Sequence, residues 1–227
     1  MEGEGKIFIG IDLGGRNKKT TAICILEEKN GRISFSKQYC SNCRDIKGED
    51  IFEIIKPFLE KTKVIAIDAP LTVGRGKGKM RLYEKFLSTG IFRQRKINPL
   101  PPALMPSLCL LAQEAVKEFQ KQGFVLDINL IETFPTFVKE VLKRDFIFSL
   151  LKEEVPCASK NQQSALVCAI VACLHFHFKT RYLGYKDGFL FLPKLSLWKS
   201  QWRQKFYRAW REKPFLRYRY LITNIFD

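Results

Sequence analysis

The stretch that decides the fold is Lys6–Gly15, KIFIGIDLGG. It is a short apolar run that ends in a carboxylate, Asp12, and a glycine pair follows. A continuous apolar run of this length is typical of a strand buried on both faces. An unpaired carboxylate is unfavourable in a core, so Asp12 is expected where the strand emerges. Gly14 and Gly15 let the backbone turn or approach a ligand closely. Two interpretations fit the stretch equally well. One is a strand followed by an ordinary turn that Asp12 caps, and the other is a metal or phosphate site.

Two later segments repeat this pattern of an apolar run followed by a carboxylate and a break. Val64–Asp68 (VIAID) ends in Asp68, and Val125–Glu132 (VLDINLIE) ends in Glu132. Both are predicted to be strands. Open sheets with parallel strands present their working residues at the carboxyl ends of those strands.

The segments between these runs set the order of the elements. Thr20–Glu27 and Ile33–Tyr39 are predicted strands, and the Asn-Gly pair between them is a strong signal for a hairpin. Further expected elements are helices over Gly48–Lys61, Met80–Leu87, Ala103–Gln122, Pro135–Lys143 and Gln162–Phe178, and a last strand over Gly188–Pro193.

An antiparallel meander that leads into parallel strands with crossover helices is the order of a ribonuclease H-like sheet. The predicted fold class is therefore α/β, with a ribonuclease H-like mixed five-stranded sheet flanked by helices. In that sheet the first strand is central and the fourth lies beside it. Asp12 and Asp68 should then meet at one edge of the sheet, with Glu132 close by.

The last part of the chain differs in character, and we divide the sequence into a domain over residues 1–193 and a basic, aromatic-rich C-terminal helical extension over residues 194–227. The extension carries nine Lys and Arg against two acidic residues. Trp198, Trp202, Phe206 and Trp210 recur every four residues, which on a helix makes one aromatic stripe. The stripe is expected to dock on the body, or else to stack bases, contact lipid headgroups or join a second copy of the chain.

Composition points to an anionic partner. The 227 residues include 39 Lys and Arg against 23 Asp and Glu, a net charge of +16. Such an excess favours polyanions, nucleic acid first and acidic membrane surfaces second, although a solvated Lys-rich surface is the plain alternative. No apolar run reaches about 18 residues, so no transmembrane helix is expected. The seven scattered cysteines include one isolated Cys40-x-x-Cys43 pair and are expected to be reduced, in a cytoplasmic protein.

Three clustered carboxylates need a counter-charge. Asp12, Asp68 and Glu132 would repel one another, and the usual remedy is a hard divalent cation with oxygen ligands, Mg²⁺ or Mn²⁺. Two such ions can activate water and stabilise the leaving oxygen in phosphodiester cleavage.

An ordered set of short motifs resembles a known family, that of predicted ribonuclease H-like nucleases with domain of unknown function 429. The resemblance covers about residues 6–193 and implies this fold and a metal-dependent nuclease activity. The motifs are Ile11-Asp12-Leu13-Gly14-Gly15-Arg16, Ile67-Asp68-Ala69-Pro70-Leu71, Arg81-x-x-Glu84, Ile131-Glu132-x-Phe134-Pro135, Ser164-Ala165-Leu166 and Asp187-Gly188-Phe189.

One motif departs from the family. The late helix of the family resembles D-x-x-D-A-L, whereas this chain has Asn161-Gln162-Gln163-Ser164-Ala165-Leu166. Both carboxylates are missing, and Asn161 offers only a neutral carbonyl oxygen. A second metal ion should therefore bind poorly, and any nuclease activity should be weak.

Three functions compete. In a metal-dependent nuclease or phosphodiesterase, Asp12, Asp68 and Glu132 would hold metal, and Glu84 would be a fourth ligand or a base. Phosphate would be contacted by Arg16, Arg81 and Lys160. The second hypothesis is a non-catalytic nucleic-acid-binding protein of the same fold. The third is a relative of actin-like sugar kinases and ATPases, whose first phosphate loop IDLGG resembles, although these usually have two such domains.

Overall fold

The computed structural model of the chain describes residues 5–36, 46–73, 80–143, 146, 149–151 and 159–212. The strands are β1 (Lys6–Asp12), β2 (Lys19–Lys29), β3 (Arg32–Phe35), β4 (Ile46–Lys47), β5 (Thr62–Asp68), β6 (Leu130–Glu132), β7 (Thr180–Tyr185) and β8 (Gly188–Pro193). The α-helices are α1 (Ile51–Ile55), α2 (Leu82–Leu87), α3 (Gly90–Arg93), α4 (Pro106–Lys121), α5 (Pro135–Val141), α7 (Lys160–Phe176) and α8 (Ser200–Arg211). Short 3₁₀ helices are η2 (Gly48–Asp50), η3 (Lys56–Lys61), η4 (Pro102–Leu104) and η5 (Leu195–Leu197).

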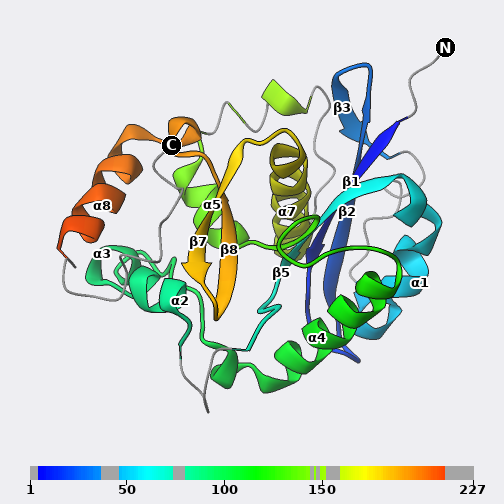
Figure 1. Cartoon of the computed structure of the whole chain (residues 1–227), viewed down its shortest axis with the longest axis horizontal. Helices are drawn as coiled ribbons and strands as arrows, with labels where there is room; N and C mark the ends of the chain where they lie inside the picture. Colours follow the sequence, from blue (N-terminus) through cyan, green and yellow to red (C-terminus); the bar gives the residue numbers. More distant parts are fainter. Residues whose placement is uncertain are drawn as a thin grey trace.

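The main sheet is mixed, and β1 lies at its centre (Figure 1). Five of its six strands lie in the order β3-β2-β1-β5-β6, and the short strand β4 also pairs with β2. The β1–β2 and β2–β3 pairs are antiparallel, and the β1–β5 and β5–β6 pairs are parallel. The prediction of an α/β fold with a mixed sheet flanked by helices is thus confirmed.

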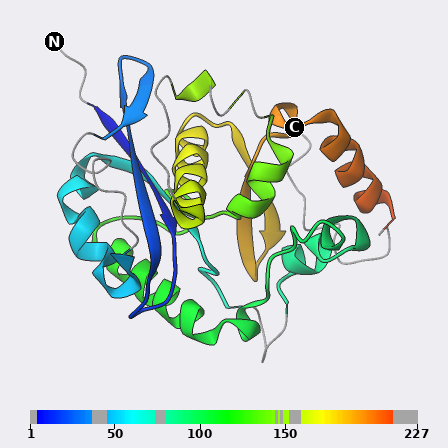
Figure 2. The same ribbon diagram turned by 180° about the vertical axis from the view of Figure 1, so that it is seen from behind.

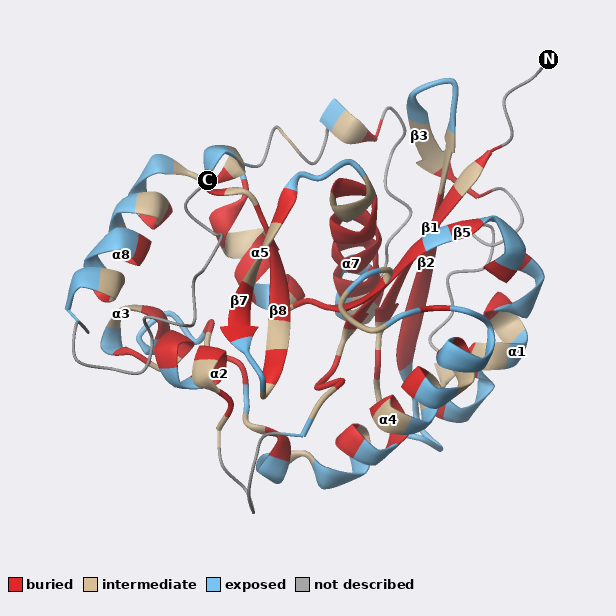
Figure 3. Ribbon diagram, viewed as in Figure 1, coloured by how far each residue is buried: buried red, intermediate tan, exposed pale blue. Residues whose placement is uncertain are grey.

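Helices cover both faces of this sheet and create two cores (Figures 1 and 2). Side chains alternate between the faces along each strand. Ile9 of β1 packs with the α1 and α4 residues of one core, and Phe8 packs with the α7 residues of the other. Helix α7 is buried almost all round, because it lies between the sheet and the β7–β8 hairpin with α5 (Figure 3).

A glycine in the central strand allows α7 to approach the sheet closely. A Cβ atom on Gly10 would lie 2.1 Å from the backbone oxygen of Ala165 and 2.1 Å from the backbone nitrogen of Ala169. The apolar run of β1 therefore needs a glycine at its centre to let the α7 backbone rest on it.

The β7–β8 hairpin forms a second, two-stranded sheet. The sequence predicted the strand at Gly188–Pro193 but not β7, which precedes it. The segment predicted as a strand over Val125–Glu132 is also shorter, because Asp127 has a left-handed φ of 65° and a turn occupies residues 127–129. The strand β6 begins only at Leu130.

The aromatic stripe of the C-terminal region packs into the main body. Trp198, Trp202 and Phe206 are at most 1% exposed and belong to the same core as α7. Trp202 stacks on Phe92 of α3, with ring centroids 6.3 Å apart. These three rings are therefore covered by the chain itself and are not available to stack bases, to contact lipid or to join a second copy.

None of the described helices is both long and apolar enough to cross a membrane. Cys40 and Cys43 lie outside the described residues.

Candidate functional site

The carboxyl ends of two neighbouring parallel strands bring Asp12 and Asp68 together. Each is the last residue of its strand, β1 or β5, and the two are register partners. Both are half-buried, and both line a cavity of about 340 Å³. The predicted placement of Asp12 beside Asp68 is therefore confirmed, and their role stays a prediction.

The alternation of side chains puts both aspartates on the α7 side of the sheet. Asp12 is in phase with Phe8 along β1, and Asp68 is in phase with Ala66 along β5. Phe8 and Ala66 belong to the core on the α7 side, whereas the isoleucines between them belong to the other core. The two carboxylates thus share one face as well as one edge.

The electrostatics of this pair favour a positive charge. Burial raises the pKa of Asp68 well above the ordinary value for an aspartate, and the charges of Asp12 and Glu132 raise it further. The ammonium of Lys139 acts in the opposite direction. Ionising both aspartates together is therefore unfavourable without a nearby cation.

Lys139, the residue whose charge lowers the pKa of Asp68, was not singled out by the sequence. It is a half-buried residue of α5, and its Nζ donates to Ser164 Oγ of α7 at 3.1 Å. The sequence does place Lys139 on the helix that follows the third predicted carboxylate. It gives no signal for the partner, which lies 25 residues further along the chain.

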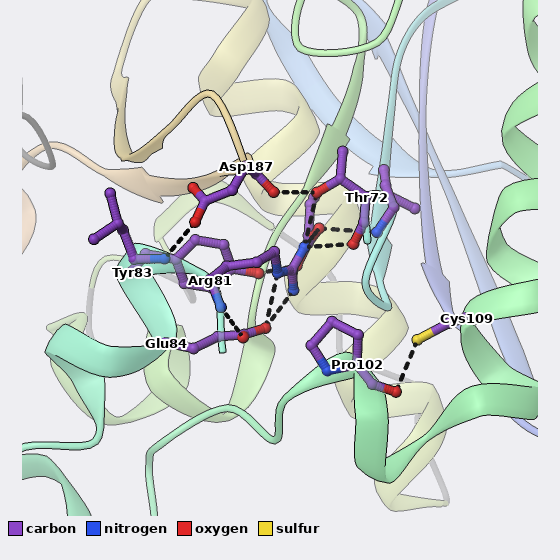
Figure 4. Close-up of polar contacts among 10 residues, drawn as sticks. Thr72, Arg81, Tyr83, Glu84, Pro102, Cys109 and Asp187 are labelled. Carbon is purple, nitrogen blue, oxygen red and sulfur yellow. Dashed lines mark hydrogen bonds and ion pairs between the residues drawn. The ribbon is translucent and has the colours of Figure 1, made fainter. Parts of the chain in front are cut away.

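Arg81 is the centre of a second, buried group of charges (Figure 4). Its side chain is 1% exposed and forms ion pairs with Glu84 at 2.6 Å and with Glu132 at 2.8 Å. Its Nη1 also donates to Thr72 Oγ1 at 3.1 Å. Burial disfavours the charged guanidinium, but Glu132, Tyr83 and Glu84 together outweigh this effect, and the pKa of Arg81 rises. Arg81 is thus engaged by its own chain, which weighs against the predicted contact between Arg81 and phosphate.

Glu132 is fully used within this buried group. Its Oε1 accepts hydrogen bonds from Arg81 Nη2 at 2.8 Å and from the Tyr83 hydroxyl, and its Oε2 accepts from Arg81 Nη1 and from the Leu71 backbone nitrogen. Its register partner on β5 is Ile67, one residue before Asp68. Glu132 lines the same cavity as the two aspartates. Because it pairs with Ile67, its position in the sheet faces the α1 and α4 side, opposite to Asp12 and Asp68.

Glu84 lies behind Arg81, away from the cavity. It is 0% exposed, its Oε1 accepts from the Arg81 guanidinium, and its Oε2 accepts from the Arg81 backbone nitrogen at 2.7 Å. Burial raises the pKa of Glu84 even though Arg81 lowers it. The structure does not bring Glu84 to Asp12 and Asp68, where it was predicted to act as a ligand or base.

The β7–β8 turn fastens the second group from the other side (Figure 4). Asp187 Oδ2 accepts from the Leu82 backbone nitrogen at 2.9 Å, at the start of α2. Gly188 has a φ of 136°, and a Cβ there would lie 2.1 Å from Thr72 Oγ1. This explains physically why Asp-Gly stands at this turn.

The other two predicted phosphate contacts lie outside this cavity. Arg16 is exposed and pairs with Glu114 of α4, at a separate hollow between η2 and α4. Lys160 is the exposed first residue of α7. Besides Arg81, the described cavity lining includes the cationic residue Lys96, which is exposed and has a left-handed φ of 56°. Nothing in the sequence distinguishes Lys96 from the other basic residues of its segment.

The glycine pair after β1 is closed by its own neighbours. Gly14 donates its backbone N–H to Thr21 Oγ1 at 2.9 Å, and Gly15 donates to Thr20 Oγ1 at 3.0 Å. These amides are already paired, so the loop does not present them to a nucleotide phosphate. This weighs against the interpretation as a phosphate loop of the kinase type.

The donor set suits one divalent ion better than two. Among the described residues, no group of three or more His, Cys, Asp and Glu side chains is placed to hold a metal ion. Mg²⁺ sites in proteins commonly use one or two carboxylates, completed by water and substrate phosphates. Asp12 and Asp68 supply two such carboxylates. The carboxylate of Glu132 already accepts four hydrogen bonds within the protein, so its oxygens are not open to a metal ion.

Comparisons of the chain with protein-family models, with curated proteins and with solved structures gave no match.

Proposed function

We propose that the protein is a divalent-metal-dependent phosphodiesterase of ribonuclease H-like fold that acts on nucleic acid. In this proposal Asp12 and Asp68 hold a single Mg²⁺ or Mn²⁺ ion. The observation that carries it is the register pairing of two half-buried aspartates at the carboxyl ends of adjacent parallel strands, beside a cavity of about 340 Å³.

The order of the strands supports the fold in this proposal. A central β1, flanked by an antiparallel meander on one side and by the parallel strands β5 and β6 on the other, is the arrangement that a ribonuclease H-like sheet requires. The net charge of +16 supports a polyanionic substrate.

Each part of the site has a separate task in the proposed reaction. When bound, a divalent ion supplies Lewis-acid polarisation of a phosphoryl oxygen and a more acidic bound water. The Asp12 and Asp68 carboxylates hold it, and Lys96 at the cavity wall contacts a substrate phosphate. The group centred on Arg81 fixes the wall on the β6 side through Glu132.

Binding of Mn²⁺, measured by calorimetry at pH 8, tests the site without a known substrate. The wild type should bind about one ion per chain, and Asp12→Asn and Asp68→Asn should each weaken binding at least about tenfold. Asp50→Asn is the matched control, because Asp50 is exposed in η2 and its side chain makes no capping hydrogen bond. A wild type that binds no Mn²⁺, or variants that bind as tightly as the control, would contradict the proposal.

Cleavage assays then test the activity itself. Single- and double-stranded DNA and RNA oligonucleotides should be cut slowly with Mn²⁺ and more slowly with Mg²⁺, and not at all by Asp12→Asn. Mn²⁺ generally binds such sites more tightly than Mg²⁺ and demands a less strict geometry.

A second candidate is a non-catalytic nucleic-acid-binding protein of the same fold. It is favoured by one observation, that Glu132 is saturated with internal hydrogen bonds and leaves only two aspartates for a metal. Oligonucleotide binding that is equally tight in wild type, in Asp12→Asn and in the presence of EDTA, without any cleavage, would support this candidate.

A further inference from the structure

The lining of the cavity beside Asp12 and Asp68 is of two chemical kinds. One part is charged and includes these two carboxylates at the ends of β1 and β5. Another part is apolar and comes from the segment that leads into α4, from α4 itself and from the residue before α5. It includes Pro99, Leu100, Met105, Leu108 and Phe134. Such a cavity suits a ligand that has a charged group and a flat or apolar group, as a nucleotide has.

The size of the cavity limits what can enter it. Its volume of about 340 Å³ is at the small end of the range for ligand pockets, which is about 300–1,000 Å³. A sphere of that volume is about 9 Å across, less than the width of the major groove of B-DNA alone, which is about 12 Å. A double helix is therefore too wide to enter, whereas a single nucleotide that has left the base stack can enter such a pocket.

Phe134 gives the apolar part of the lining a firmly held aromatic ring. It is half-buried and packs against the core on the α7 side. The backbone on both sides of it is fixed, because the Thr133 N–H donates to the Ile67 carbonyl at 3.0 Å. The Val138 N–H likewise donates to the Phe134 carbonyl at 3.0 Å. An aromatic ring held in this way is a platform on which a nucleobase can stack.

The other aromatic ring of the described lining, that of Tyr83, is already in use. Its hydroxyl donates to Glu132, and the guanidinium carbon of Arg81 lies 4.6 Å from the centre of its ring. In the part of the chain that the structure describes, no aromatic ring pairs with Phe134. Phe134 is therefore the ring of this lining that is left for a ligand.

A turn after α3 brings a polar side chain, Asn98, to the same cavity. The Lys96 N–H donates to the Arg93 carbonyl at 3.0 Å, and the left-handed φ of Lys96 ends this turn. Ile97 is 4% exposed and belongs to the core on the α7 side, and the residues on either side of it, Lys96 and Asn98, line the cavity. Pro99 restricts the backbone of Asn98 to extended conformations. Among the described residues none forms a hydrogen bond with the Asn98 amide, so its donor and its acceptor remain for a ligand.

We infer that Phe134 and Asn98 form a nucleobase subsite, so that the cavity takes one unstacked nucleotide. The base stacks on Phe134 and Asn98 bonds its edge, which leaves the phosphate for the charged part of the lining. Adenine is the base that presents a donor and an acceptor matching an asparagine amide. The substrate is then a single strand, a strand end or a free nucleotide, and not an intact duplex. For the reaction the inference rests on the proposed function, whereas base binding can be tested without metal.

The first experiment follows the binding of adenosine, an uncharged nucleoside, to the full-length chain in EDTA by NMR titration. The wild type should bind adenosine, and Phe134→Ala should weaken binding at least about fivefold because the stacking platform is lost. Phe134→Tyr keeps the ring and should bind as the wild type does. If Phe134→Ala does not fold, Phe134→Leu, which keeps much of the apolar volume, should show the loss. Phe178→Ala is the matched control, because Phe178 is 83% exposed beyond α7 and is not part of the described cavity lining.

The second experiment tests Asn98 with purine riboside, which lacks the 6-amino group of adenosine. The wild type should bind adenosine at least about fivefold more tightly than purine riboside, since a bidentate amide contact discriminates to at least this degree. Asn98→Ala should bind the two nucleosides alike. Gln94→Ala removes an exposed amide just after α3 and should keep the preference of the wild type.

Displacement of adenosine distinguishes the source of the nucleotide. A single-stranded oligodeoxyadenylate that displaces adenosine at a lower nucleotide concentration than adenosine 5′-monophosphate does supports the subsite with nucleic acid as its ligand. The reverse order supports the subsite with a free nucleotide as its ligand. A covalently closed duplex of the same sequence should displace adenosine at least about tenfold less well than the single strand, because its bases must first unpair and unstack.

The outcomes separate this inference from the proposed function. The subsite is overturned if adenosine does not bind, if Phe134→Ala binds it as tightly as the control, or if the wild type does not distinguish the two nucleosides. Equal displacement by duplex and single strand overturns it as well. Any of these results can occur while Mn²⁺ binds and cleavage proceeds. If adenosine binding depends on Phe134 and Asn98 but the wild type binds no Mn²⁺, the proposed function fails and the subsite stands.

Discussion

At the scale of single residues, the group around Arg81 is unusual because one guanidinium serves two buried carboxylates. Arg81, Glu84 and Glu132 are each at most 5% exposed. Fork-shaped hydrogen bonding to both carboxylates offsets much of the desolvation of the three groups. The compensation is incomplete at Glu84, because burial raises its pKa by more than Arg81 lowers it. This group therefore depends on every one of its hydrogen bonds.

Replacing Arg81 should be severe. Arg81→Met leaves Glu84 and Glu132 buried without a cation, and the free energy of unfolding should fall by about 3–5 kcal/mol. Arg81→Lys should recover only part of this, because an ammonium lacks the planar fork. Urea unfolding measures both, and Arg93→Met, at an exposed position of α3, is the control. An Arg81→Met protein with near wild-type stability would show that the carboxylates are accommodated in another way.

Asp68 should make stability depend on pH in a predictable direction. Well below pH 3.8, the ordinary pKa of an aspartate, the carboxyl is protonated in both the folded and unfolded chain. As the pH rises above this value the unfolded chain releases its proton first, because the folded-state pKa is raised by burial and by Asp12. The folded wild type therefore loses stability until its own carboxyl ionises.

Asp68→Asn removes this loss. In metal-free protein its melting temperature should exceed that of the wild type by about 3 °C at pH 8, and the difference should shrink toward zero near pH 4. Melting curves across this pH range test the sign, and a difference that grows as the pH falls would refute it.

At the scale of elements, the contact between β1 and α7 decides whether the site is assembled. Gly10→Ala would force a methyl group to within 2.1 Å of backbone atoms of α7, which cannot move as a side chain can. We expect a loss of about 3 kcal/mol in the free energy of unfolding. Gly90→Ala at the start of α3 is the control, since a Cβ there meets nothing within 4 Å. Equal stability of the two variants would mean that α7 shifts freely on the sheet.

The main sheet could be predicted from the sequence because its strands are marked by continuous apolar runs and by one Asn-Gly turn. The start of β6 and the whole of β7 could not. The run before Glu132 contains Asp127, and the conformation of that residue is set by a local turn in which Asn129 accepts from the Val125 backbone nitrogen. Only three residues separate the end of α7 from the start of β7, and none of them is a Gly or Pro that would mark the boundary.

The candidate site was predicted in part, and the reason lies in strand register. Asp12 and Asp68 end two strands that pair in register, and the order of elements was enough to bring them together. Glu132 pairs with Ile67 instead, and one residue of offset moves a side chain to the other face. The hydrogen bonds of Glu132 to Arg81 and the contact of Lys139 with Ser164 depend on tertiary packing, which no local pattern encodes.

At the scale of the whole molecule, α8 completes the core on the α7 side and keeps its charges outside. Trp202 and Phe206 are buried against α2 and α3, and Phe86 meets Phe206 with ring centroids 5.3 Å apart. The opposite surface of α8 is basic. One helix thus combines a structural stripe with a charged surface, and the two can be tested separately.

The basic surface of α8 contributes to the net charge of +16 and can be tested for nucleic-acid binding. A triple variant replaces Arg203, Arg208 and Arg211 of α8 by glutamine. If the surface contacts phosphates, the triple variant should bind DNA or RNA more weakly whatever the sequence, and the salt dependence of binding should fall by about 2–3 units of log–log slope. The melting temperature should change little, because the aromatic stripe is untouched and exposed charges contribute little to stability.

A matched control distinguishes this surface from charge in general. The substitutions Lys56→Gln, Lys61→Gln and Lys63→Gln remove the same three charges from exposed positions of η3 and the start of β5. These positions lie at the end of β5 opposite Asp68. Long-range attraction alone would make both triple variants lose affinity equally, because each lowers the net charge by the same amount. If α8 contacts phosphates directly, the salt dependence of binding should become weaker only in the arginine variant. The reason is that only counterions displaced at the contact are released on binding.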